Sequence, residues 1–199
     1  MARALSRIKA DLSACRICET RFAETATAHA PRPIVWFNTA PRILIAGQAP
    51  GMRVHQSGVP FDDPSGDRLR DWMGIDRATF YNQDRIAIVP MGFCFPGYNA
   101  TAADLPPPAI CAKTWRTKVL DTIGQPRLML LVGGLAQKHH LRVKTGVTQT
   151  VADWRAHIST GLPLPHPSWR NTGWINKNPW FTAEVLPELK RRVKEALND

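Results

Sequence analysis

The chain has 199 residues, of which 44% are hydrophobic and 21% charged, a balance that excludes a disordered or low-complexity protein and fits one globular domain. No apolar run approaches the roughly 20 residues of a membrane span, and the N-terminal stretch lacks the apolar core of a secretory signal. We therefore expect a cytoplasmic protein without a membrane partner. Lys and Arg number 26 against 16 Asp and Glu, a formal charge of +10. Such a surplus favours a polyanionic partner, although a basic surface without a specific partner is the alternative.

The predicted elements alternate along the chain. Residues 1–22 have apolar side chains at Leu5, Ile8 and Leu12, the spacing of an amphipathic helix. Short β-branched or leucine-rich runs, each ending in or beside glycine, then predict strands that are buried on both faces of a parallel sheet. These runs cover residues 41–47, 85–93 and 127–134, and another short apolar run precedes 162–174. Helical patterns cover 65–74, 108–124, 135–143 and 178–199, the last with Pro187 as a possible interruption.

Alternating strands and helices predict one α/β domain over residues 1–199: a three-layer α/β/α sandwich with a central, mostly parallel four-stranded sheet. Ligands of such folds bind outside the carboxyl ends of the strands. Three loops rich in glycine, proline and polar residues should converge there, namely 45–67, 93–108 and 162–174.

The four cysteines form two pairs, Cys15 with Cys18 and Cys94 with Cys111. Disulfides are not expected in a cytoplasmic protein. Four thiolates suit zinc or an iron–sulfur cluster, and their spacing does not choose between the two. Four independent buried thiols are the remaining alternative. A shared metal would join the N-terminal helix to the loop that follows the second strand.

Three motifs, in addition to these cysteines, carry a family resemblance. They are "GQAPG" followed by "SGVPF" (47–61), "FDDPSGD" (61–67) and "HPSWRNT" (166–172). Together they resemble the uracil-DNA glycosylase superfamily, specifically its iron–sulfur families 4 and 5, over roughly residues 10–175. The resemblance implies a monomeric repair enzyme that flips uracil out of DNA and hydrolyses its N-glycosidic bond, leaving an abasic site. It also implies a 4Fe–4S cluster on Cys15, Cys18, Cys94 and Cys111, with zinc as the less favoured alternative.

The resemblance assigns roles around a flipped base. Phe61 is a stacking face, or alternatively a core aromatic, and the backbone at Gln48 and Ala49 faces the base. His166 donates to uracil O2 as negative charge develops, in the manner of an oxyanion hole. Asn99 is a candidate base reader because an amide both donates and accepts hydrogen bonds; a turn asparagine is the alternative.

The catalytic carboxylate departs from the usual pattern. Gln48 and Ala49 stand where other uracil glycosylases have Glu or Asp, so the first motif has no water-activating carboxylate. The resemblance to family 5 implies a catalytic aspartate just before S-G-D, which makes Asp63 our first choice and Asp62 our second. The alternative is a helix cap, since Asp and Ser are favoured there without any catalytic role.

The segment after His166 replaces the loop that fills the space of a flipped base. Ser168, Trp169 and Arg170 are therefore predicted to contact DNA, with Trp169 stacking and Arg170 reaching a phosphate or the orphan base. A surface loop with a buried tryptophan is the alternative. Lys138–His140 are expected to start a helix whose N-terminus holds phosphate, or to be a solvated face. A binder of uracil-containing or abasic DNA with little turnover, and a zinc-stapled nucleic-acid module, are the competing functions.

Overall fold

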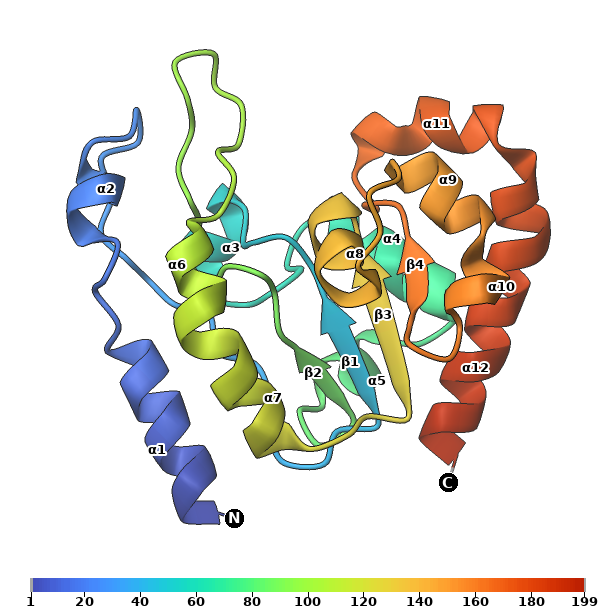
Figure 1. The fold of residues 1–199 in the computed structure, drawn as a ribbon, viewed down its shortest axis with the longest axis horizontal. Coiled ribbons are helices and arrows are strands. Elements are labelled where there is room, and N and C mark those ends of the chain that lie inside the picture. Colours follow the sequence, from blue (N-terminus) through green and yellow to red (C-terminus); the bar gives the residue numbers. More distant parts are fainter. Residues whose placement is uncertain (1, 199) are drawn as a thin grey trace.

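A computed structural model describes residues 2–198; the predicted ends at Met1 and Asp199 lie outside them. The centre of the fold is a four-stranded sheet of β1 (Ile43–Ala46), β2 (Ile86–Ile88), β3 (Leu128–Val132) and β4 (Leu162–Leu164). The strand order is β2-β1-β3-β4, and every neighbouring pair is parallel (Figure 1). β1 is buried along its whole length, as its unbroken apolar run predicted.

Helices cover both faces of this sheet, which confirms the three-layer α/β/α fold. On one face, α4 (Pro64–Met73) and α12 (Leu186–Asn198) pack Leu69, Trp72 and Leu189 against the strands. On the other face, α1 (Ala2–Ser13) and α7 (Thr117–Ile123) form a second cluster, and α8 (Gly134–Leu141) covers β3. The remaining helices are short: α2 (Glu19–Ala23), α3 (Met52–Ser57), α5 (Arg77–Tyr81), α6 (Ala109–Cys111), α9 (Val147–Ala152), α10 (Trp154–His157) and α11 (Thr172–Lys177).

The predicted helix over residues 1–22 is wrong in its extent. α1 ends at Ser13, and a turn leads into α2. The apolar spacing explains the break, because Leu12 is the last residue of the stripe and is fully buried. Cys15 and Cys18 lie in the turn between α1 and α2, outside both helices.

Pro187 does not interrupt the last helix. A π-helical turn, Phe181–Val185, leads directly into α12, and Pro187 is the second residue of α12. The wider turn accommodates a residue without an N–H donor. A second π-helical turn, Ala112–Arg116, joins α6 to α7, so residues 109–123 are helical throughout, close to the predicted range 108–124. Within residues 2–198, no helix has both the length and the apolarity needed to cross a membrane.

Candidate functional site

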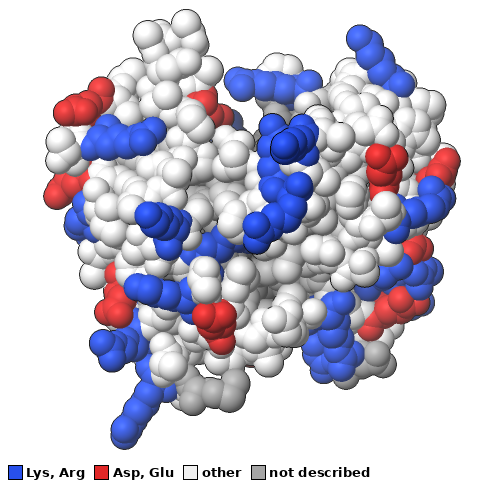
Figure 2. Space-filling view, in the orientation of Figure 1, with Lys and Arg blue, Asp and Glu red and all other residues white. Residues whose placement is uncertain are grey.

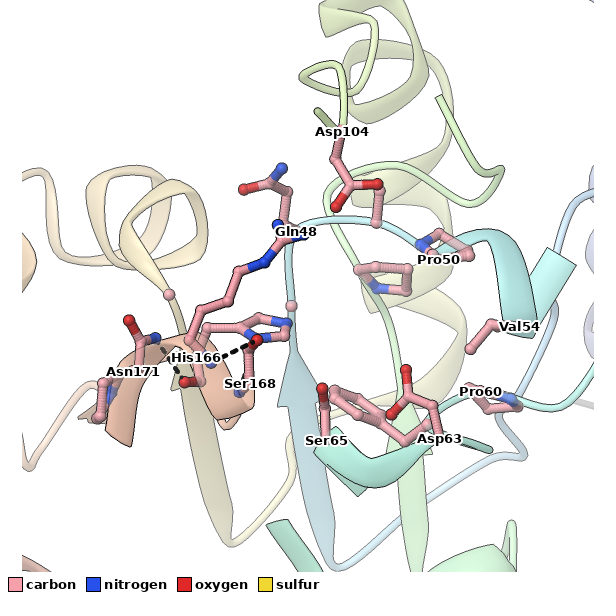
Figure 3. A pocket seen from close by; sticks show the side chains of 18 of the residues that line it. Gln48, Pro50, Val54, Pro60, Asp63, Ser65, Asp104, His166, Ser168 and Asn171 are labelled. Carbon is pink, nitrogen blue, oxygen red and sulfur yellow. Dashed lines mark hydrogen bonds between the residues drawn. The ribbon is translucent and has the colours of Figure 1, made fainter. Parts of the chain in front are cut away.

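A pocket of about 700 Å³ lies at the carboxyl ends of the strands, and we call it the strand-end pocket (Figure 3). Every strand sends a following loop into its wall: Gly47–Pro50 follow β1, Pro90 follows β2, Gly133 follows β3 and His166 follows β4. In the sheet, β1 has β2 on one side and β3 on the other, so the connection after β1 and the connection after β2 run in opposite directions across the sheet. Such a switch point opens a crevice at this edge of the sheet, and Gln48 and Ala49 line it.

His166 is held at one defined position, and burial favours its neutral form. The backbone N–H of Ser168 donates to its Nδ1 over 3.2 Å, and the Asn171 side chain donates to its carbonyl over 2.7 Å. Burial lowers the pKa of His166, while the carboxylates of Asp63 and Asp104 act in the opposite direction. A neutral imidazole that accepts at Nδ1 carries its proton on Nε2, and Figure 3 shows this ring directed into the pocket.

Arg68, on α4, stabilises the turn that follows His166 from outside the pocket. One guanidinium nitrogen donates to the Ser168 carbonyl over 3.0 Å, and another donates to the Thr172 hydroxyl over 3.1 Å. These bonds join α4 to a loop about a hundred residues later in the chain. Arg68 is not among the residues that line the strand-end pocket. Nothing in the sequence pattern pointed to it, because only the fold places α4 beside this turn.

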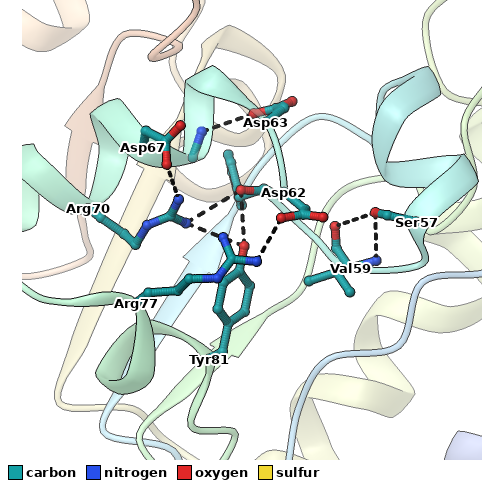
Figure 4. Close-up of polar contacts among 10 residues, drawn as sticks. Ser57, Val59, Asp62, Asp63, Asp67, Arg70, Arg77 and Tyr81 are labelled. Atoms are coloured by element: carbon teal, nitrogen blue, oxygen red, sulfur yellow. Dashed lines mark hydrogen bonds and ion pairs between the residues drawn. The ribbon is translucent and has the colours of Figure 1, made fainter.

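Phe61 lines the pocket in a strained backbone conformation, with a φ of +54°. Its carbonyl accepts from the Tyr81 hydroxyl over 3.1 Å and from Arg70 over 3.4 Å (Figure 4). Gly66 is required beside it, because a Cβ there would lie 1.8 Å from the Phe61 carbonyl oxygen. The ring packs edge-on against Phe80 and remains half-buried, so it belongs both to the core and to the pocket. Strain held in place by such contacts is typical of functional sites.

The two neighbouring aspartates have different places. Asp63 lines the pocket and is also the N-cap of α4, with its Oδ1 accepting from the Gly66 N–H over 2.9 Å. The helix-cap alternative is therefore correct for one of its oxygens. Asp62 does not line the pocket, and its carboxylate pairs with Arg77 at 2.8 Å (Figure 4).

The hairpin 97–105 brings a different residue to the pocket than the one expected. Asn99 does not line it; its Oδ1 accepts from Thr101 N, Thr101 Oγ1 and Ala103 N over 2.9–3.0 Å, so Asn99 is the turn residue of the alternative reading. Asp104, which the motifs did not single out, lines the wall above Gln48 and Pro50 (Figure 3). Its only signal in the sequence was its position in a loop that follows a core strand.

The three residues that were predicted to contact DNA lie together at the strand-end pocket. Ser168, Trp169 and Arg170 all line it. The Trp169 side chain is 70% exposed, which excludes the buried-tryptophan alternative, and the Arg170 guanidinium lies 5.9 Å from the centre of its ring. Figure 2 shows Lys and Arg side chains spread over one face, including its middle.

The phosphate site predicted at Lys138–His140 is wrong. α8 begins at Gly134, so these residues fall in its last turn instead of at its N-terminus. Gly133 and Gly134 already form the start of the helix and line the pocket. The His140 ring instead contacts the buried Arg116 guanidinium.

All four cysteines line one small apolar pocket together with Phe22, Pro108 and Trp115. Burial raises the pKa of Cys94 to about 12 and that of Cys111 to about 11, and neighbouring thiols add to both effects. The Trp115 indole N–H donates to Cys15 Sγ over 3.3 Å, and the Phe93 N–H donates to Cys111 Sγ over 3.4 Å. The cysteines described are free thiols. Across residues 2–198, no three His, Cys, Asp or Glu are arranged to hold a metal ion.

Comparison with known protein families gives a match over most of the chain. The model of the uracil DNA glycosylase superfamily matches residues 34–190. This range contains all four loops of the strand-end pocket, and it begins after Cys15 and Cys18. With an all-parallel sheet, helices on both faces and a pocket at the strand ends, the chain has a DNA glycosylase fold and belongs to the uracil DNA glycosylase superfamily.

Proposed function

We propose that this protein removes uracil from DNA by hydrolysing the N-glycosidic bond, as a monofunctional enzyme of base excision repair that acts as a monomer. The observation that carries the proposal is His166, a neutral ring with its Nε2–H free to donate into the pocket. A buried donor aimed at a developing oxyanion is the largest single contribution in many enzymes. Uracil leaves as an anion, so a donor at its O2 stabilises the leaving group.

The pocket supplies the other parts of base recognition. The Phe61 ring offers a stacking surface for a flipped base, and its strained backbone is fixed before substrate arrives. The backbone at Gln48 and Ala49 lines the same pocket. In our proposal, Asp63 places negative charge beside C1′ as the sugar becomes cationic, which is the demand of oxocarbenium-like transition states. Asp62 has no such role, because Arg77 engages it outside the pocket.

Ser168, Trp169 and Arg170 contact the DNA around the extruded nucleotide in this proposal. Trp169 is exposed at the rim of the pocket, where its ring can stack in the space that the base vacates. Arg170 beside it carries the charge for a phosphate contact. The net charge of +10 supports a substrate with a phosphate backbone.

We also propose that Cys15, Cys18, Cys94 and Cys111 hold a 4Fe–4S cluster. Their shared apolar pocket and the two N–H donors to sulfur support a group bound by four thiolates. A cluster has a separate iron for each thiolate, so its ligands need not converge on one ion as zinc ligands do. Its role in this proposal is structural, because it joins the turn after α1 to the loop after β2 and to the end of α6.

The test is release of uracil from a 5′-labelled oligonucleotide with a single uracil, in single- and double-stranded form, under excess protein. We expect strand cleavage only after alkali, since a monofunctional glycosylase leaves the abasic strand intact. His166→Ala should slow release about 10²–10³-fold, and Asp63→Asn should also slow it. His157→Ala, on α10, is the matched control and should keep the wild-type rate.

The competing function is a DNA-binding protein with little turnover. The lack of a carboxylate at Gln48 and Ala49 is the observation that favours it. Tight binding of uracil-containing or abasic DNA, with no alkali-labile site formed by the wild type, would establish that function instead. A panel of duplexes with hypoxanthine, xanthine or a thymine mismatch separates an inactive protein from one with another base specificity.

A further inference from the structure

Hydrolysis of a glycosidic bond requires a water molecule that is oriented and deprotonated as it attacks C1′. The first motif does not supply a carboxylate for this task, since Gln48 and Ala49 stand there. Two carboxylates line the strand-end pocket, those of Asp63 and Asp104. One oxygen of Asp63 is occupied by its bond to the Gly66 N–H, which ties that side chain to the first turn of α4.

Asp104 differs from Asp63 in how its carboxylate is held. Its carboxylate has no hydrogen bond or ion pair to another side chain within the described residues, and it is exposed at the pocket wall. Figure 3 shows it above the Gln48–Pro50 segment and directed toward the pocket. A carboxylate supplied by the hairpin 97–105 therefore lies over the part of the first motif that lacks one.

The hairpin fixes the position of Asp104. Asp104 pairs with Tyr98 across the hairpin, and the Leu105 N–H donates to the Gly97 carbonyl over 2.9 Å. Asn99 closes the tip through three donors to its Oδ1. The Tyr98 ring packs on Phe95, 5.1 Å between centroids, which anchors the hairpin to the body of the protein. These contacts hold the backbone of Asp104 in place at the pocket wall.

We propose that Asp104 is the catalytic carboxylate that orients the attacking water and accepts its proton. The proposal rests on the hydrolysis of an N-glycosidic bond put forward above. The water oxygen forms a bond to C1′ while the bond from C1′ to N1 of uracil breaks, and the bonding pair leaves with the base. The water proton passes to Asp104, so the products are a hydroxyl at C1′ and a uracil anion that accepts the Nε2–H bond of His166.

The two carboxylates then have separate tasks. Asp63 is held by its hydrogen bond to the first turn of α4 and stabilises the cationic sugar. Asp104 accepts the proton of the attacking water. Both lie within electrostatic reach of His166, since each acts to raise the pKa that burial lowers. Two carboxylates with divided roles around one anomeric carbon are also the arrangement of many glycoside hydrolases.

The experiment measures single-turnover release of uracil by Asp104→Asn, with Asp121→Asn on the exposed side of α7 as the matched control. We expect Asp104→Asn to slow release about 10²–10⁴-fold, the range of general-base catalysis, with the control unchanged. Loss of a negative charge should leave the Kd for DNA equal or lower. In Asp104→Ala, added formate should restore part of the rate, because a free carboxylate can enter the space of the missing side chain.

A wild-type rate in Asp104→Asn would overturn the proposal and leave uracil excision standing. A slow Asp104→Ala that formate does not restore, and that also binds DNA more weakly, would overturn it too, because the hairpin would then serve DNA binding. Absence of uracil release by the wild type would overturn the proposed function itself, and the assignment of Asp104 with it.

Discussion

Replacement of Arg68 tests whether the turn after His166 is held from α4. Arg68→Ala removes two hydrogen bonds, to the Ser168 carbonyl and to the Thr172 hydroxyl. A hydrogen bond from a charged donor contributes about 1.5–3 kcal/mol. Counting only the part-buried bond to the Ser168 carbonyl, because the bond to Thr172 is exposed to solvent, its loss from the productive arrangement of the turn corresponds to about a 10- to 150-fold lower rate. Arg68 does not line the pocket, so its effect is limited by that of His166→Ala, about 10²–10³-fold.

The assay is a double-mutant cycle on single-turnover uracil release, at protein concentrations that saturate the DNA. We expect Arg68→Ala to lower the rate in the wild type and to have little further effect in His166→Ala, because both variants remove the same contribution. Arg68→Lys keeps the positive charge and one of the two hydrogen bonds, so its rate should lie between those of the wild type and Arg68→Ala. In ¹⁵N spectra of the histidine rings, Arg68→Ala should weaken the acceptor signature of His166 Nδ1.

Additive losses in the double variant would refute this reasoning, since Arg68 would then act independently of His166. A second refuting result is weaker DNA binding with an unchanged rate at saturation. Arg68 would in that case be a phosphate contact, and Arg68→Lys would behave like the wild type.

Trp169→Ala should weaken binding to abasic DNA by about 1–3 kcal/mol, the contribution of one stacked base, as measured by a titration at fixed salt; an unchanged Kd would contradict the stacking role. Anaerobically purified protein should be brown with about four iron atoms per chain, and Cys94→Ala should lose the iron and lower the Tm; a colourless protein with stoichiometric zinc would contradict the cluster. Burial and the nearby Arg116 lower the pKa of His140 to about 3, whereas the unfolded chain takes up this proton near pH 6.5, so the free energy of unfolding falls as the pH drops below about 6.5. His140→Gln should therefore lose less free energy of unfolding between pH 7 and pH 5 in urea titrations, and an equal loss would contradict the shift.

The core strands and the loops that follow them were predictable because both depend on local sequence. Ile43–Ala46, for example, are apolar at consecutive positions, a pattern typical of a strand buried on both faces. The order of strands and helices then determines which loops meet at the carboxyl edge of the sheet. For this reason His166, Phe61 and Asp63 were placed in the pocket from their motifs alone.

The short helices and the end of α1 at Ser13 could not be predicted from the hydrophobic pattern. α3, α5 and α9 have five or six residues each, too few for a helical periodicity to stand out. Such helices are stabilised by tertiary packing more than by their own propensity. Lys138–His140 lie in the last turn of α8 because the helix begins at Gly134, directly after Gly133.

The family, the sheet and the motif residues could be predicted because they follow from residue type and order along the chain. Which side chains face the pocket depends instead on how the folded layers pack. Asp62 and Asp63 are adjacent in sequence, yet Arg77 draws one away while the other caps α4 at the pocket wall. Asp104 and Arg68 acquire their positions from a hairpin and from a helix distant from the motifs. Contacts between segments so far apart in the chain are set by how the layers pack, and no local pattern records them.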